Sequence, residues 1–163
     1  MELEQELQKV VEQEAKLVFP HFDASTAWGL GVALREAALA RGAAVTIDIR
    51  RSEEILFFHA MPGTTPANAD WARRKRNVVE LLRRSSYAAS LDGRLAGVSI
   101  EEKMGLPIRD YACHGGSFPI RVASAGHVGT VTVSGLPQRE DHALIVGVIA
   151  RLLGHDPVLL AFD

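Results

Sequence analysis

The sequence predicts an α+β protein in which two antiparallel hairpins form one sheet and helices cover it. Three observations indicate this fold: helical hydrophobic periodicity in several segments, period-two alternation in two pairs of short segments, and no regular exchange of strands and helices. The chain has 163 residues, 47% of them hydrophobic. This is enough for one core without disulfides, and we expect a single domain over residues 1–163.

Two helices are expected before the first strand. Residues 2–18 place leucine and valine at helical spacing, with Glu and Gln on the other faces. Asp23 can cap a second helix, which ends at Gly42, because glycine suits the left-handed position after a helix. Residues 43–50 and 54–61 then alternate with a period of two and predict the first hairpin, whose second strand is apolar on both faces.

Helices are also expected between and after the hairpins. Thr65 and Pro66 fit the cap and first position of a helix over about 66–84. Two shorter helical pieces follow, and the second has a capping box from Ser99 to Glu102. The remaining elements are a second hairpin over 117–123 and 127–134 and a last helix over about 139–153.

Charge and hydropathy exclude several classes of protein. The chain has 18 basic and 20 acidic residues, so it lacks the basic excess that nucleic-acid binding requires. No apolar run approaches the roughly 20 residues that cross a bilayer, and the acidic start MELEQELQKV is unlike a basic signal peptide. We therefore expect a cytoplasmic protein with no nucleic-acid partner and no membrane association.

Lys75 is the most informative residue of the third helix, because it interrupts an apolar stripe that includes Trp71 and Val78. Either its methylenes cover the apolar surface while the ammonium reaches water, or the ammonium meets a carboxylate or phosphate in a pocket beside Trp71. A buried ammonium needs a partner or a lowered pKa. The arginines around it indicate either a solvated face or an anion-attracting surface; they are Arg73, Arg74, Arg76, Arg83 and Arg84.

The segment YACHGGSFPI is a second candidate for chemistry. Gly115 and Gly116 allow unusual backbone angles, so their N–H groups could form an anion-binding concavity; the alternative is a tight turn that needs glycine for steric reasons. His114 beside them could act as an acid, a base or a metal ligand. No metal site is predicted, since no spacing resembles C-x-x-C or H-E-x-x-H; Asp141 and His142 are the candidate ligands if a metal is held.

The outward face of the predicted sheet is polar. Asp48 and Arg121 are expected to pair across strands on this face. The face is either exposed to solvent or packed on a second subunit. A second subunit would also explain why the strand over 54–61 is apolar on both sides. We therefore expect an oligomer. The polar positions are Thr46, Asp48, Arg121, Thr130 and Thr132.

Three segments in this order, PGTTPANADWARRKRNVVELLRRSSYA, YACHGGSFPI and GTVTVSGLPQREDH, resemble an uncharacterised bacterial and fungal subgroup of the haem-degrading-domain, GlcG-like family. The resemblance covers nearly the whole chain. It implies a profilin-like α+β fold and a cytosolic homo-oligomer built from dimers. Because distant members of the family bind or degrade haem, it also implies haem as a candidate cofactor.

Residue chemistry and resemblance together predict a site for a small anionic ligand that carries a carboxylate, either haem or a metabolite. Lys75 and the backbone of the glycine loop are expected to contact the carboxylate. Two alternatives stay open: an enzyme with His114 as catalytic acid or base, with or without a metal at Asp141 and His142, and an oligomeric adaptor that uses the basic face. The predicted ligand-binding residues are Trp71, Lys75, Asn77, His114, Gly115, Gly116 and Ser117.

Overall fold

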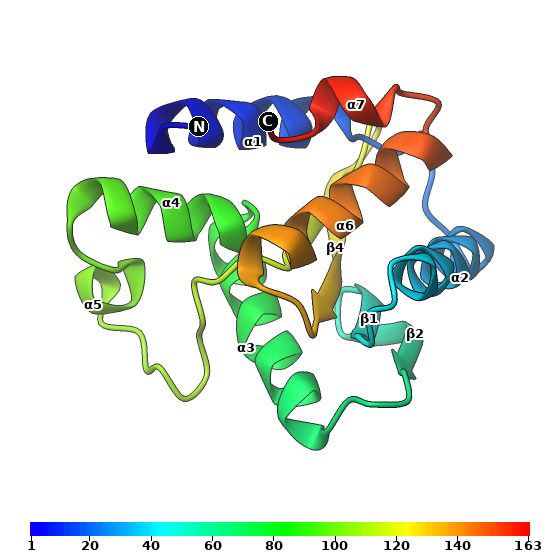
Figure 1. Cartoon of the computed structure of the whole chain (residues 1–163), viewed down its shortest axis with the longest axis horizontal. Coiled ribbons are helices and arrows are strands. Elements are labelled where there is room, and N and C mark those ends of the chain that lie inside the picture. Colours follow the sequence, from blue (N-terminus) through cyan, green and yellow to red (C-terminus); the bar gives the residue numbers. More distant parts are fainter.

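A four-stranded antiparallel sheet with the strand order β2-β1-β4-β3 forms the centre of the protein (Figure 1). The computed structural model describes residues 1–163. The first predicted hairpin is β1 (Thr46–Arg51) with β2 (Glu54–Ala60), and the second is β3 (Ser117–Val122) with β4 (Gly126–Ser134). Because β1 also pairs with β4, the two hairpins join into one sheet, and the predicted α+β class is confirmed.

Seven helices surround this sheet (Figure 1). Six of them correspond to predicted helices, with ends that differ by a few residues. The seventh, α7, has only four residues and begins at Pro157 after the capping residue Asp156. The helices are α1 (Leu3–Lys16), α2 (Ala24–Ala40), α3 (Pro66–Leu82), α4 (Ser86–Ala96), α5 (Ile100–Met104), α6 (Gln138–Leu152) and α7 (Pro157–Leu160).

The predicted caps fix several helix ends. Asp23 Oδ1 accepts a hydrogen bond from the Thr26 backbone N–H at 2.8 Å, so α2 starts where its sequence predicts. Ser99 Oγ accepts one from the Glu102 N–H at 3.1 Å, and α5 ends at Gly105 in the left-handed conformation.

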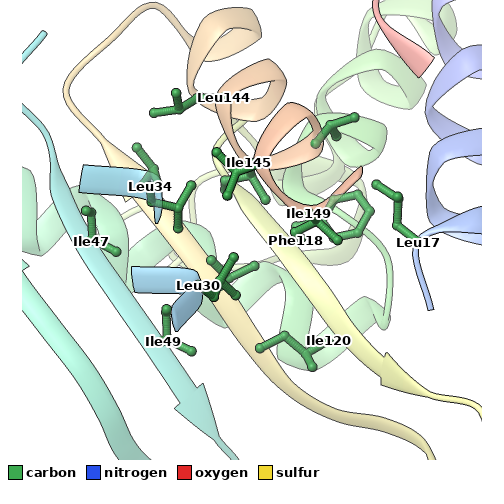
Figure 2. Packing of buried hydrophobic residues seen from close by; sticks show 14 of the residues in the cluster. Leu17, Leu30, Leu34, Ile47, Ile49, Phe118, Ile120, Leu144, Ile145 and Ile149 are labelled. Carbon is green, nitrogen blue, oxygen red and sulfur yellow. The ribbon is translucent and has the colours of Figure 1, made fainter. Parts of the chain in front are cut away.

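The apolar core lies between one face of the sheet and the helices α2 and α6 (Figure 2). Alternating strand residues point into it, as period-two patterns require. Each fully buried Leu, Ile or Phe side chain contributes roughly 1.5–3 kcal/mol of hydrophobic free energy. The central members are Leu30, Leu34, Ile47, Ile49, Phe118, Ile120, Ile145 and Ile149.

Helix α3 covers the opposite, polar face of the sheet, where it packs on β1, β3 and β4. The prediction that this face is wet or packed on another subunit was wrong, because Thr46, Thr130 and Thr132 are buried under a helix of the same chain. The predicted pair of Asp48 and Arg121 was also wrong, since β4 lies between β1 and β3.

The two members of that expected pair have other partners. Asp48 binds Arg50 and Arg76 instead. Arg121 donates to the backbone carbonyl of Arg83 at 2.6 Å and lies 3.8 Å from the Glu14 carboxylate.

Strand β2 is at one edge of the sheet and remains open to solvent. Phe58 is 48% exposed and Ile55 is 55% exposed. They lie opposite Asp48 and Arg50 of β1, on the polar face. The edge is therefore apolar and uncovered.

None of the helices is both long and apolar enough to cross a membrane.

Candidate functional site

The Lys75 side chain is buried inside the protein, with only 3% exposed. It lies on the inner face of α3 with Ala72, Val78 and Val79. Its ammonium donates to the Val133 carbonyl at 2.6 Å, to the Gly115 carbonyl at 3.1 Å and to Asp141 Oδ2 at 3.1 Å. The alternative in which the ammonium reaches water is therefore wrong, and the carboxylate that it meets belongs to this chain.

Asp141 lies in the first turn of α6 and is as deeply buried as Lys75. Its Oδ1 accepts from the Leu136 N–H at 3.0 Å and its Oδ2 from the Gly135 N–H at 3.4 Å. Burial raises the pKa of Asp141 and lowers that of Lys75, and their mutual attraction opposes both shifts. Because these two N–H groups and the ammonium all favour the carboxylate form, we assign the pair as ionised.

Gly116 allows this pair to approach the loop. Its φ of +129° lies in a region that favours glycine, and a Cβ there would collide with Lys75 Nζ and the Val133 carbonyl. The Gly115 N–H donates to Gln138 Oε1 at 3.0 Å, so it is not free to bind an anion. The diglycine therefore has a steric role: it lets the loop pass over the Lys75 ammonium.

An open cleft of about 300 Å³ lies above the Lys75–Asp141 pair. Trp71 and His114 form its mouth, with their rings edge to face and their centroids 5.4 Å apart. Trp71 is 39% exposed, although it lies on a helix with a buried inner face. The cleft is lined by Asn68, Trp71, Lys75, His114, Gly115, Ser134, Gly135, Leu136, Gln138 and Asp141.

A second cleft of about 420 Å³ adjoins the first, between the loop and the helices α4 and α5. The two clefts share His114 and Gln138, so the imidazole stands between them. Cys113 also lines the second cleft, where burial raises the pKa of its thiol. A thiol protonated at neutral pH is a poor nucleophile, so Cys113 is not a catalytic candidate.

His114 is the titratable side chain at the junction of the two clefts. Partial burial lowers its pKa, the charges of Lys75 and Arg74 lower it further, and Glu101 opposes them. The imidazole is therefore neutral at pH 7. It makes no hydrogen bond to another side chain or to the backbone, so a ring nitrogen is available to a ligand, a proton or a metal ion.

Asn77 and Ser117 do not line the Trp71–His114 cleft, and neither does Gly116. Asn77 Nδ2 donates to the Asp110 carbonyl at 2.8 Å and anchors the segment before the loop. Ser117 is buried, with its Oγ 2.8 Å from Thr132 Oγ1.

Asp141 and His142 are adjacent in sequence but turn to different partners, because His142 Nε2 lies 2.7 Å from Gln13 Oε1. No group of three or more His, Cys, Asp or Glu side chains is arranged to hold a metal ion.

Asn68 and Gln138 line the cleft and were missed by the sequence analysis. Asn68, Trp71 and Lys75 share one face of α3 by their spacing, so helical periodicity could have identified Asn68. Gln138 starts α6, and its contact with Gly115 joins segments 23 residues apart. No sequence pattern indicated this contact.

The arginines of α3 are partly engaged within the chain. Arg73 pairs with Asp70 at 3.1 Å and with Asp110 at 2.9 Å. Arg74 stacks on Trp71 at 4.4 Å from the ring centroid and donates to the Ile108 carbonyl. Arg73 is therefore paired with acids, whereas Arg74 is held in place but keeps its charge.

Together, the fold and the clefts define a class: small α+β proteins with an open cleft, bounded by a tryptophan and a histidine, above a buried ion pair. A family model described as "Haem degrading protein HbpS-like" matches residues 22–150. The chain belongs to this HbpS-like haem-degrading family, which confirms the resemblance identified from sequence.

Curated relatives are similar over almost their whole length. A UPF0303 protein of Burkholderia thailandensis is 56% identical over 155 residues, which cover 95% of this chain and 94% of the relative. A UPF0303 protein of Paraburkholderia phymatum is 52% identical over 161 residues, which cover 99% of this chain and 98% of the relative.

Solved structures share the fold. The crystal structure of Ybr137w protein has a TM-score of 0.81 at 26% identity, with 91% of this chain and 87% of that one covered. A crystal structure of a PduOC:heme complex has a TM-score of 0.64 at 18% identity, with 82% and 94% covered. At that identity the likeness establishes the fold alone.

Proposed function

We propose that this protein binds a small, carboxylate-bearing ligand in the cleft lined by Trp71 and His114, and that haem is the leading candidate. The observation that carries the proposal is the pairing of an exposed indole with a neutral imidazole that has no partner of its own. Large exposed aromatic side chains that bound a concave, partly polar site are typical of ligand binding.

In this proposal Lys75 is a positioning residue. Its three N–H donors already have three acceptors, so it does not also contact a ligand carboxylate. It holds Gly115 and Asp141 in place at the floor of the cleft. Ligand carboxylates would instead meet Arg94, which lines the second cleft.

The residues present fit haem in three respects. The adjoining clefts, about 300 and 420 Å³, meet at His114 and together reach the size of a cofactor site. Apolar lining side chains are available in both mostly polar clefts: Trp71 and Leu136 in the first, Val98 and Ile100 in the second. A neutral imidazole can coordinate iron, and bound haem would supply a redox-active iron centre.

Titration with haemin, followed by its visible absorption band, tests this proposal. We expect saturable binding that His114→Ala and Trp71→Ala each weaken at least tenfold, because each removes a principal contact. Trp28→Ala is the matched control, since Trp28 is 65% exposed on α2, outside both clefts. Haemin dimethyl ester should bind more weakly than haemin if carboxylates are recognised. Equal affinities for all variants would contradict the proposed site.

We also propose that the protein is a homo-oligomer and that the β2 edge contributes to its interface. An edge strand has unpaired backbone groups, and monomers usually protect such edges with charge. Here β2 instead presents Ile55 and Phe58 to solvent on the polar face, and on the opposite face the exposed Trp28 packs edge to face on Phe57. A second copy that pairs with this edge would bury these side chains.

A further inference from the structure

A third cleft lies at the other end of α3 and β4 from the Trp71–His114 cleft and shares no lining residue with it. It has a volume of about 610 Å³ and lies where the end of β1, the second half of α3 and the start of β4 meet. We call it the arginine cleft. Its principal side chains are Arg50, Arg76, Asn77, Glu80, Arg83 and His127.

The buried Asp48 fixes two of the three guanidinium groups. Arg50 donates to Asp48 through Nε at 2.9 Å and through Nη2 at 3.1 Å, and Arg76 donates through Nη1 at 3.1 Å. One carboxylate can neutralise only one of the two cations. Both guanidinium groups therefore line the cleft in fixed positions with several unused N–H donors, and together with Asp48 they carry one net positive charge; the lining also includes the carboxylates of Glu53 and Glu80.

The third guanidinium has no partner within the chain. Arg83 ends α3 in the left-handed conformation, with φ of +58°, and its exposed side chain makes no ion pair. A positive φ of this kind is uncommon for residues other than glycine, asparagine and aspartate. The position sets the Arg83 side chain at the rim of the arginine cleft.

His127 is also unsatisfied. Its side chain is only 9% exposed, and neither ring nitrogen has a hydrogen-bond partner. The nearest acidic atom, Glu80 Oε1, lies 3.6 Å from Nε2 and likewise has no hydrogen bond. Buried polar atoms normally have partners, so His127 and Glu80 keep hydrogen-bonding capacity that the chain itself does not use.

We propose that the arginine cleft binds a small, hydroxyl-rich phosphate ester of the sugar-phosphate class. The guanidinium groups of Arg50, Arg76 and Arg83 present the forked donors that match phosphate oxygens. The side-chain oxygens of Glu80 and Asn77 can accept hydrogen bonds from ligand hydroxyl groups. Only Val128 gives the lining an apolar side chain, which favours a polar ligand. This site is independent of the function proposed for the Trp71–His114 cleft.

Calorimetric titration with ribose 5-phosphate, inorganic phosphate and ribose tests the assignment. Ribose 5-phosphate should bind saturably, inorganic phosphate more weakly and ribose undetectably. Arg83→Gln should weaken ribose 5-phosphate at least tenfold, because a charge-assisted contact is lost. Arg35→Gln is the control, since Arg35 is exposed on α2 and also lacks a partner. Arg83 makes no side-chain contact that folding needs, so both variants should fold.

Amide chemical shifts locate the binding independently. On addition of ribose 5-phosphate, the largest changes should occur at Ser52, His127 and Val128, with none at His114 or Gly115. Absence of saturable binding, equal effects of the two arginine variants, or equal affinities for ribose 5-phosphate and inorganic phosphate would each overturn the assignment.

Discussion

The Lys75 ammonium lies 3.1 Å from the Asp141 carboxylate, and both side chains are only 3% exposed. This ion pair joins α3 to the first turn of α6, and through the Gly115 carbonyl it also holds the loop that carries His114. A buried pair of this kind contributes little net stability, but loss of one partner is costly because the other charge stays buried.

Lys75→Met should therefore lower the free energy of unfolding by about 3–5 kcal/mol, measured by urea denaturation. The double variant Lys75→Met/Asp141→Leu should recover much of this loss, because it leaves no unpaired charge. A loss below about 1 kcal/mol for Lys75→Met would mean that Asp141 is satisfied without the ammonium.

Gly116→Ala should destabilise the protein by more than the backbone strain alone, because its Cβ would meet the Lys75 ammonium and the Val133 carbonyl. Gly126→Ala is a matched control: Gly126 also has a positive φ, of +74°, but open space around it. The control should cost about 1–2 kcal/mol, and Gly116→Ala clearly more. Equal losses would show that the loop can move away from Lys75.

His142 should make stability fall with acid. Burial lowers its pKa from 6.5 to about 3 in the folded protein. The unfolded chain therefore binds a proton that the folded chain does not, so His142 lowers stability as the pH falls from 6.5 towards 3. Between pH 7 and 5 the expected loss is about 2 kcal/mol. Urea denaturation of His142→Gln at both pH values should show a loss of unfolding free energy that is smaller by this amount. The same loss as in the wild type would show that His142 is not its source.

Phe58→Lys should dissociate the proposed oligomer, because it places a charge in the apolar edge of β2. Light scattering coupled to gel filtration should give a smaller mass for Phe58→Lys than for the wild type or for the control Phe58→Leu. A monomeric wild type, or an identical mass for all three proteins, would argue against this interface.

Local patterns predicted most of the fold. The caps at Asp23 and Ser99 and the alternation of both hairpins depend on residues close in sequence, so their structure could be inferred directly. The order of the strands depends on long-range pairing of β1 with β4, which no local pattern encodes. The expected pair of Asp48 and Arg121 was wrong for this reason.

The candidate site could be predicted only in part. Helical spacing placed Trp71 and Lys75 together, and the glycines indicated either an anion-binding concavity or a tight turn that needs glycine. The partner of Lys75 could not be identified, because Asp141 is 66 residues away and approaches only when α6 packs on the sheet. The ammonium was therefore expected to contact a ligand, whereas its acceptors lie within the chain.

Fluorescence of a single tryptophan tests the ligand cleft most directly. Trp28→Phe leaves Trp71 as the one tryptophan of the protein. Haemin should quench this fluorescence saturably, with the same midpoint as the change in haemin absorption, because the ligand is proposed to lie against the indole. A haemin absorption change without quenching of Trp71, or no saturable change in either, would contradict binding in the cleft lined by Trp71 and His114.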